Sequence, residues 1–294
     1  MNRRRFPWPG TVPGTLRFPP GLGFVLPGLA GFSVFFIFPF GLSLVYAFMD
    51  KPLGGSFVGF SNFTGLFRNP AYLRGLGNTV RFIGISAPLN LAVSLGLALL
   101  LNRAGKHRKW FSLVFLIPLV IPSGSMVFFW KTFFSYDGAL NGLLRKAGLE
   151  KINYLDSNLA LPVMILIYGW KNCGYNMVLF LTGLGNIPRD YYEAAWVDNA
   201  SPLQCFIHVT LPCLLPVSIL AFIMSIINSF KIFREIYLIT GSYPHESLYT
   251  LQHFMNNQFV SLNYPRLTSA AAVLVVIITV LTQFLLRLER RAAR

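Results

Sequence analysis

The chain of 294 residues contains 54% hydrophobic but only 12% charged residues, whereas soluble domains carry about 25% charged residues. This composition excludes an ordinary soluble domain. The formal net charge of +15 could indicate a nucleic-acid-binding protein, but the basic residues are not interleaved with aromatic residues as such binding requires. They lie mostly at the ends of apolar runs, where basic residues indicate the orientation of membrane spans.

Residues 1–21 form a basic, proline-rich segment that contains Arg3, Arg4 and Arg5. The segment resembles the start of a signal peptide, but the apolar run that follows is too long and lacks a small-residue cleavage site. We therefore expect residues 1–21 to be a cytoplasmic tail that precedes a retained first span.

Six apolar runs are long enough to cross a hydrocarbon core of about 30 Å, which takes about 20 helical residues. They predict an all-α integral membrane protein with a single transmembrane domain over residues 22–288. The six predicted spans lie near residues 22–49, 78–102, 111–134, 160–184, 210–230 and 267–288.

The short basic segments agree on the orientation of these spans. With six spans, residues 1–21, the loop 103–109, the polar stretch 186–209 and the C-terminal tail 289–294 all lie on one side. The first, second and fourth of these segments are rich in arginine or lysine. The positive-inside rule makes this side cytoplasmic, so both termini are expected there, and the connections 50–77, 135–159 and 231–266 are expected on the outer face.

Residues 186–216 read NIPRDYYEAAWVDNASPLQCFIHVTLPCLLP and predict two short helices joined by a tight turn. Pro188 suits the first position of a helix, and Asp190 and Glu193 are expected in the first turn, where the helix dipole favours negative charge. Asn199 tolerates the left-handed conformation that ends many helices.

The second short helix of this stretch has its own start and stop signals. Ser201-Pro202 combines an N-cap residue with a first-turn proline, and Leu211-Pro212 is expected to end the helix. The alternative interpretation of the stretch is a simple surface hairpin.

These residues resemble the EAA loop of the permease subunits of binding-protein-dependent ABC importers. The matching positions are Glu193, Ala194, Ala195, Asp198, Asn199, Ala200, Phe206, Leu211 and Pro212. That family has glycine where this chain has Asn199, and both residue types accept a positive φ. In the family this loop is the cytoplasmic coupling helix between spans four and five, which seats in a groove of the ATPase subunit.

The resemblance implies a set of partners. These are a second permease subunit, two ATPase subunits that bind ATP and Mg, and an extracytoplasmic solute-binding protein, all at a bacterial or archaeal cytoplasmic membrane. The sequence contains no Gly-x4-Gly-Lys-Ser/Thr phosphate loop, so ATP hydrolysis is expected in the partner and no cofactor in this chain. The scattered His and Cys residues do not predict a metal site.

Lys171 lies within the fourth predicted span, where a lysine costs about 2.5–3.5 kcal/mol at the bilayer centre, so it is expected to face protein or a wet cavity. Tyr168, Asn172 and Tyr175 share a broad helix face with it. Tyrosine rings can stack on a sugar, and amides can bond its hydroxyl groups. In the alternative, Lys171 extends to the outer interface within an aromatic belt.

In the maltose-type permeases that this chain resembles, the sugar site is lined by the corresponding third, fourth and fifth spans. The match adds Ser123, Asn228 and Lys231 to the candidate substrate path. Lys171 and Lys231 depart from the family's residue types, which also suits an acidic sugar or a glycerol phosphodiester. The prolines around Ser123 predict either a break that lines a cavity or a packing kink.

Three other functions compete with a sugar importer. A stand-alone secondary transporter would be indicated by inverted repeats with matching broken helices, and none is visible. An intramembrane enzyme needs catalytic groups on facing spans, which here are nearly free of carboxylates. Non-sugar ABC importers share the EAA loop, but six spans and the segment 234–251 look most like the sugar branch.

Overall fold

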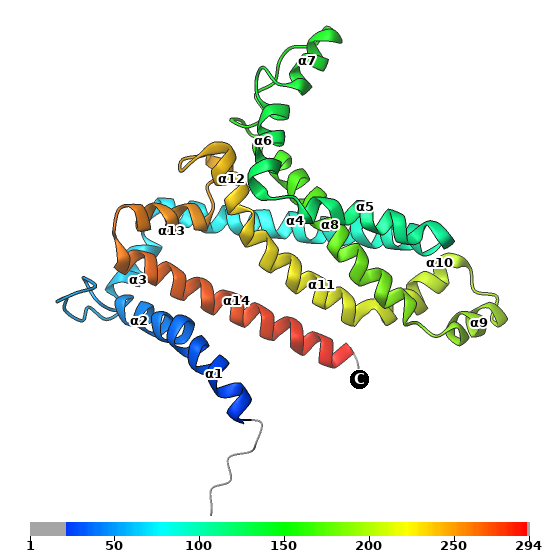
Figure 1. The fold of residues 1–294 in the computed structure, drawn as a ribbon, viewed down its shortest axis with the longest axis horizontal. Helices are drawn as coiled ribbons and strands as arrows, with labels where there is room; N and C mark the ends of the chain where they lie inside the picture. The colour runs from blue at the N-terminus through cyan, green and yellow to red at the C-terminus, as the bar shows by residue number, and fades with distance from the viewer. Residues whose placement is uncertain (1–21, 293–294) are drawn as a thin grey trace, which may run out of the picture.

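The computed structural model describes residues 22–292, and the regular elements of this part of the chain are all helices, joined by turns and loops. Its one extended pairing is an isolated antiparallel bridge between Met49 and Phe57. The long helices lie side by side, whereas α6 and α7 project away from the rest (Figure 1). The predicted all-α class is confirmed for the described residues.

The helices follow one another along the chain with short connections. The longer ones are α1 (Leu22–Phe32) with α2 (Phe38–Tyr46), α4 (Pro70–Asn102), α5 (Arg108–Val120), α6 (Ser123–Phe134), α8 (Ala160–Gly185), α11 (Leu211–Lys231) and α14 (Tyr264–Ala292). The shorter ones are α3 (Ser61–Phe67), α7 (Ala139–Lys146), α9 (Arg189–Val197), α10 (Pro202–Cys205), α12 (Phe233–Thr240) and α13 (Leu251–Val260).

Four helical stretches are long and apolar enough to cross a membrane. They are Gly23–Tyr46, Pro70–Asn102, Pro202–Thr240 and Tyr264–Leu288, and α5 with α6 makes a fifth if a bent pair counts as one span. Helix α8 is 26 residues long, but the polar residues in its middle keep it outside this set. Residues 22–292 therefore belong to a multi-pass membrane protein.

The third predicted span, residues 111–134, is divided into two helices at the prolines around Ser123, where a break or a kink is predicted. Helices α5 and α6 meet at a bend of 91°. Ile121 and Pro122 between them have extended backbones, with ψ of 127° and 137°. A proline pushes the preceding residue out of the helical region and cannot donate a helix hydrogen bond, so α5 ends at Val120 and α6 restarts at Ser123.

The expectation that Leu211-Pro212 ends the second short helix is wrong. A π-helical turn, Phe206–Thr210, joins α10 directly to α11, and helix continues from Pro202 to Thr240. Pro212 lies in the first turn of α11, and the wide turn before it re-pairs the backbone around the missing N–H. The connection 231–266 is likewise more ordered than expected, since it contains α12 and α13.

Helix α8 is the centre of the bundle and packs against α4, α5 and α11. Helix α4 presents a stripe of small or short polar residues at intervals of four, Ser86, Asn90, Ser94 and Ala98, all buried. Small residues let membrane helices approach closely. Ser94 Oγ accordingly donates a 3.0 Å hydrogen bond to the carbonyl oxygen of Cys173 in α8.

The predicted N-terminal tail, residues 1–21, lies outside the described residues. Of the predicted C-terminal tail, residues 289–292 continue α14, and the last two residues also lie outside the description.

Candidate functional site

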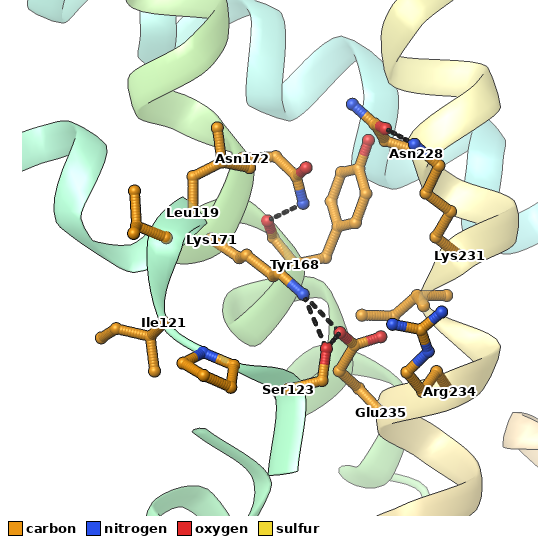
Figure 2. A pocket seen from close by; sticks show the side chains of 13 residues that line it. Leu119, Ile121, Ser123, Tyr168, Lys171, Asn172, Asn228, Lys231, Arg234 and Glu235 are labelled. Atoms are coloured by element: carbon orange, nitrogen blue, oxygen red, sulfur yellow. Dashed lines mark hydrogen bonds and ion pairs between the residues drawn. The ribbon is translucent and has the colours of Figure 1, made fainter. Parts of the chain in front are cut away.

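A cavity of about 350 Å³ lies where the break between α5 and α6 meets α8, α11 and α12 (Figure 2). Its lining combines an apolar wall with a set of charged and amide side chains. The lining residues are Leu119, Val120, Ile121, Pro122, Ser123, Tyr168, Lys171, Asn172, Asn228, Lys231, Ile232, Arg234 and Glu235. Six of the seven residues predicted for a substrate path are among them.

Lys171 of α8 is paired inside the protein. Its Nζ lies 2.5 Å from Glu235 Oε1 of α12 and donates a 3.3 Å hydrogen bond to Ser123 Oγ at the start of α6. Ser123 Oγ in turn donates to the same Glu235 oxygen at 2.9 Å. The Lys171 side chain is 18% exposed and that of Glu235 only 2%. Lys171 thus faces protein and a polar cavity, as its burial cost in a membrane requires.

The network joins three elements that are distant in the sequence. The break at Pro122 exposes the start of α6, α8 supplies the cation, and α12 supplies the carboxylate, as the dashed contacts in Figure 2 show. Hydrogen bonds to charged groups contribute about 1.5–3 kcal/mol each. The network therefore fixes the bend of α5–α6 against α8 and α12.

Two further cations line the same cavity. Lys231 Nζ donates a 3.0 Å hydrogen bond to Asn228 Oδ1, and Arg234 lies beside Glu235 (Figure 2). Within residues 22–292, neither cation forms an ion pair. The cavity lining contains three cations and one carboxylate, so it carries a surplus of positive charge.

Tyr168 and Asn172 are structural as well as cavity-lining. The Tyr168 hydroxyl donates to the carbonyl oxygen of Ser225 at 2.7 Å, and its ring packs edge-to-face on Phe82. Asn172 Nδ2 donates to the carbonyl oxygen of Tyr168 at 2.9 Å. With 1% of its surface exposed, the Tyr168 ring offers no free face for stacking.

Tyr175 is the one predicted path residue that does not line the cavity. It lies one turn further along α8, where Asn176 faces α11 instead and donates to Ser225 Oγ at 2.8 Å. Tyr168 and Asn176 thus attach α8 to the same residue of α11.

Glu235 and Arg234 are cavity residues that sequence reasoning did not identify. They lie in a segment interpreted as a connection between spans, not as part of the path. A usable signal was present, because a lysine buried in a membrane calls for a carboxylate partner. Glu235 follows the fifth predicted span by only a few residues.

The EAA-like residues from Glu193 to Ala200 lie in the hairpin of α9 and α10, residues 189–205. Phe206 follows in the π-helical turn, and Leu211 and Pro212 begin α11. Asn199 has φ of 56°, and the Ala200 amide donates to the carbonyl oxygen of Ala195 at 2.9 Å, which closes α9 as predicted. Ser201 and Gln204 form the capping box that starts α10. Pro188 is the N-cap and not the first helical residue, and only Asp190 is in the first turn, so the expected position of Glu193 is corrected.

The hairpin exposes large apolar side chains at the end of the bundle. Trp196 is 64% exposed, Val197 82% and Leu203 66%, and Glu193 and Ala194 are exposed beside them. Within the chain, the Tyr192 hydroxyl holds α9 to Thr210 of the π-helical turn at 2.9 Å. Of the remaining motif residues, Asp198, Asn199, Leu211 and Pro212 are also exposed, while Ala195, Ala200 and Phe206 are half-buried.

Comparison with known proteins identifies permease proteins of transport systems as relatives of this chain. The sulfoquinovosyl glycerol transport system permease protein SmoG of Agrobacterium fabrum is 35% identical over 72% of this chain and 70% of its own. The lactose transport system permease protein LacF of Rhizobium radiobacter is 32% identical over 91% and 94%.

A solved bacterial ABC transporter involved in the import of the acidic polysaccharide alginate has the same fold. A chain of that structure superposes with a TM-score of 0.80 at 23% identity, covering 92% of this chain and 95% of its own. Residues 90–294 match the family described as the binding-protein-dependent transport system inner membrane component. The chain therefore belongs to this family of transport permeases.

Proposed function

We propose that the chain is one of two permease subunits of an ATP-driven importer of sugars or oligosaccharides. Family membership supplies the transport role, and relatives named for lactose and arabinooligosaccharide transport support a carbohydrate cargo. The observation that carries the proposal is the polar cavity at the broken helix α5–α6, inside an otherwise apolar bundle. Charged side chains are costly inside membrane spans, and where they occur they mark a substrate or ion path.

The proposed topology has six spans with both termini in the cytoplasm. It counts α5–α6 as a broken third span and α8 as the fourth, whose polar middle is enclosed by α4, α5 and α11. The loop between α4 and α5, the α9–α10 hairpin and the end of α14 lie toward one end of the molecule (Figure 1). The loop is rich in basic residues, and this supports a cytoplasmic assignment for that end.

The α9–α10 hairpin is the proposed contact with the ATPase subunit, which would bind ATP and Mg. Its exposed Trp196 and Val197 fit the aromatic and apolar centre of a protein interface. Glu193 would make a charged contact, and the small side chains of Ala194 and Ala195 would allow close approach. Closure of two ATPase subunits would push α9 and rock the spans from inward-facing to outward-facing.

The cavity is the proposed part of the substrate path in this chain. Ser123, Lys171, Asn172, Asn228 and Lys231 line it, and a second permease subunit would supply the other half. An extracytoplasmic solute-binding protein would deliver the cargo. A solved alginate transporter in complex with a substrate-bound periplasmic protein, which shares the fold, supports that arrangement.

The decisive experiment is a pull-down of the tagged chain from membranes in mild detergent, with uptake measured in the same cells. We expect a second permease, an ATPase and a solute-binding protein to accompany the chain. Glu193→Lys and Ala195→Asp should abolish uptake while leaving membrane insertion intact. Glu150→Lys, an exposed charge reversal outside the hairpin, is the matched control, and full transport by Glu193→Lys would refute the coupling role.

A further inference from the structure

The excess positive charge of the cavity is not balanced by a paired carboxylate within residues 22–292. Lys171 and Glu235 neutralise each other, so the net charge of the lining comes from Lys231 and Arg234. Both side chains are exposed and lack an ion-pair partner within the described residues. Two cations held three residues apart at the mouth of a concave site attract an oxyanion, because focused charge raises the local concentration of counter-ions.

Glu235 is the one carboxylate in the lining of the cavity. Its Oε1 accepts hydrogen bonds from Lys171 and Ser123, but its buried Oε2 has no hydrogen-bond partner among the described residues. A buried carboxylate oxygen without a donor is costly. This oxygen has almost no accessible surface, so the polar groups open to a ligand are the two cations and the amides of Asn172 and Asn228. Together they call for a ligand that carries both hydroxyl groups and an oxyanion.

The rest of the lining fits the body of such a ligand. Leu119, Val120, Ile121 and Ile232 form an apolar wall, which suits the C–H face of a sugar ring, and Asn172 and Asn228 offer amides. At about 350 Å³, the cavity is near the lower end of ligand pockets, which span about 300–1,000 Å³. It therefore suits a short saccharide unit.

We propose that this cavity selects an acidic saccharide, whose carboxylate, sulfonate or phosphate binds Lys231 and Arg234 while its hydroxyl groups bond the amides of Asn172 and Asn228. This inference rests on the proposed function, since it assigns a substrate class to the same path. Lys171 has a positioning role, because its pair with Glu235 holds α12, which also carries Arg234, against α8.

The test uses the permease purified with its partner subunits in lipid nanodiscs, without the solute-binding protein. D-Glucuronate, D-glucose and inorganic sulfate serve as probes, and the apparent affinity comes from the concentration dependence of the melting temperature. We expect glucuronate to bind more tightly than either glucose or sulfate. The preference should weaken with added salt, because both cations are exposed and screened.

Variants of the two cations separate a built site from general surface charge. Lys231→Gln and Arg234→Gln should each weaken glucuronate binding about fivefold, and the double variant more than tenfold, given the modest energy of exposed charge contacts. Glucose binding should weaken by a smaller factor, because glucose carries no anionic group for the two cations to bind. Lys131→Gln is the matched control, because Lys131 is exposed on α6 and does not line the cavity.

The outcomes separate this inference from the proposed function. Equal binding of glucose and glucuronate, or equal losses in Lys131→Gln and Lys231→Gln, would overturn the acidic-saccharide assignment while ATP-driven sugar uptake could stand. Sulfate binding as tight as glucuronate would show a bare anion site and overturn the saccharide part. Absence of any partner ATPase and of any sugar uptake would instead overturn the proposed function itself.

Discussion

Helix α8 and the α9–α10 hairpin follow each other in the chain but differ in which side chains they bury and which they expose. Helix α8 buries Lys171 against a carboxylate and turns its amides toward α11 and its own backbone. The hairpin instead exposes Trp196, Val197 and Leu203. Polar side chains buried in an apolar helix indicate a substrate path. Apolar side chains exposed on a polar hairpin indicate a contact with a partner protein.

The largest expected effect lies in the buried network of α8. Lys171→Met leaves Glu235 as an unpaired buried charge, and breaking a buried ion pair costs about 3–5 kcal/mol. The melting temperature of the purified complex, or its yield if it does not assemble, measures the loss.

The double variant Lys171→Met with Glu235→Met sharpens this prediction. Replacing a buried pair by apolar residues of similar volume is often neutral, so the double variant should recover most of the lost stability while losing transport. A double variant as unstable as Lys171→Met would contradict a pairwise interaction.

The second prediction concerns the hairpin. Trp196→Ser should weaken association with the ATPase subunit by about 2 kcal/mol or more, since an exposed tryptophan is a common interface hot spot. Co-purification at graded detergent concentrations measures this. The melting temperature of the chain alone should change little, because the side chain is mostly exposed.

Trp110→Ser is the matched control for the hairpin. Trp110 is 71% exposed in the first turn of α5, outside the hairpin. Equal loss of the ATPase in both variants would show that the hairpin is no special contact.

The third prediction tests the close packing of α8 against α5. A Cβ on Gly174 would overlap the carbonyl oxygen of Phe115 in α5, so Gly174→Ala must push the helices apart. Overpacking costs about 1–3 kcal/mol. Gly169→Ala in the same helix is the control, because a Cβ there meets no atom within 4 Å. Equal melting temperatures in the two variants would contradict the contact.

The two regions also differ in how far the sequence predicts them. The hairpin was predicted closely because its determinants are local: a residue that accepts positive φ, an N-cap serine and a following proline. The partner of Lys171 was not predicted, because Glu235 lies 64 residues away in the chain. The position of Ser123 beside this pair depends on the 91° bend between α5 and α6, whose size the local sequence does not specify.

The smallest expected effect is at the turn of the hairpin. Asn199 has φ of 56°, a conformation that costs most residues about 1–2 kcal/mol but is tolerated by asparagine and free for glycine. Asn199→Ala should therefore loosen the turn and reduce uptake moderately, while Asn199→Gly should keep or improve it. Hydrogen exchange of the Ala200 amide, which donates to Ala195, measures the turn directly. If Asn199→Ala and Asn199→Gly exchange equally fast, the left-handed residue is not what aligns α9 with α10, and the exposed face of the hairpin must be held by the Tyr192–Thr210 contact instead.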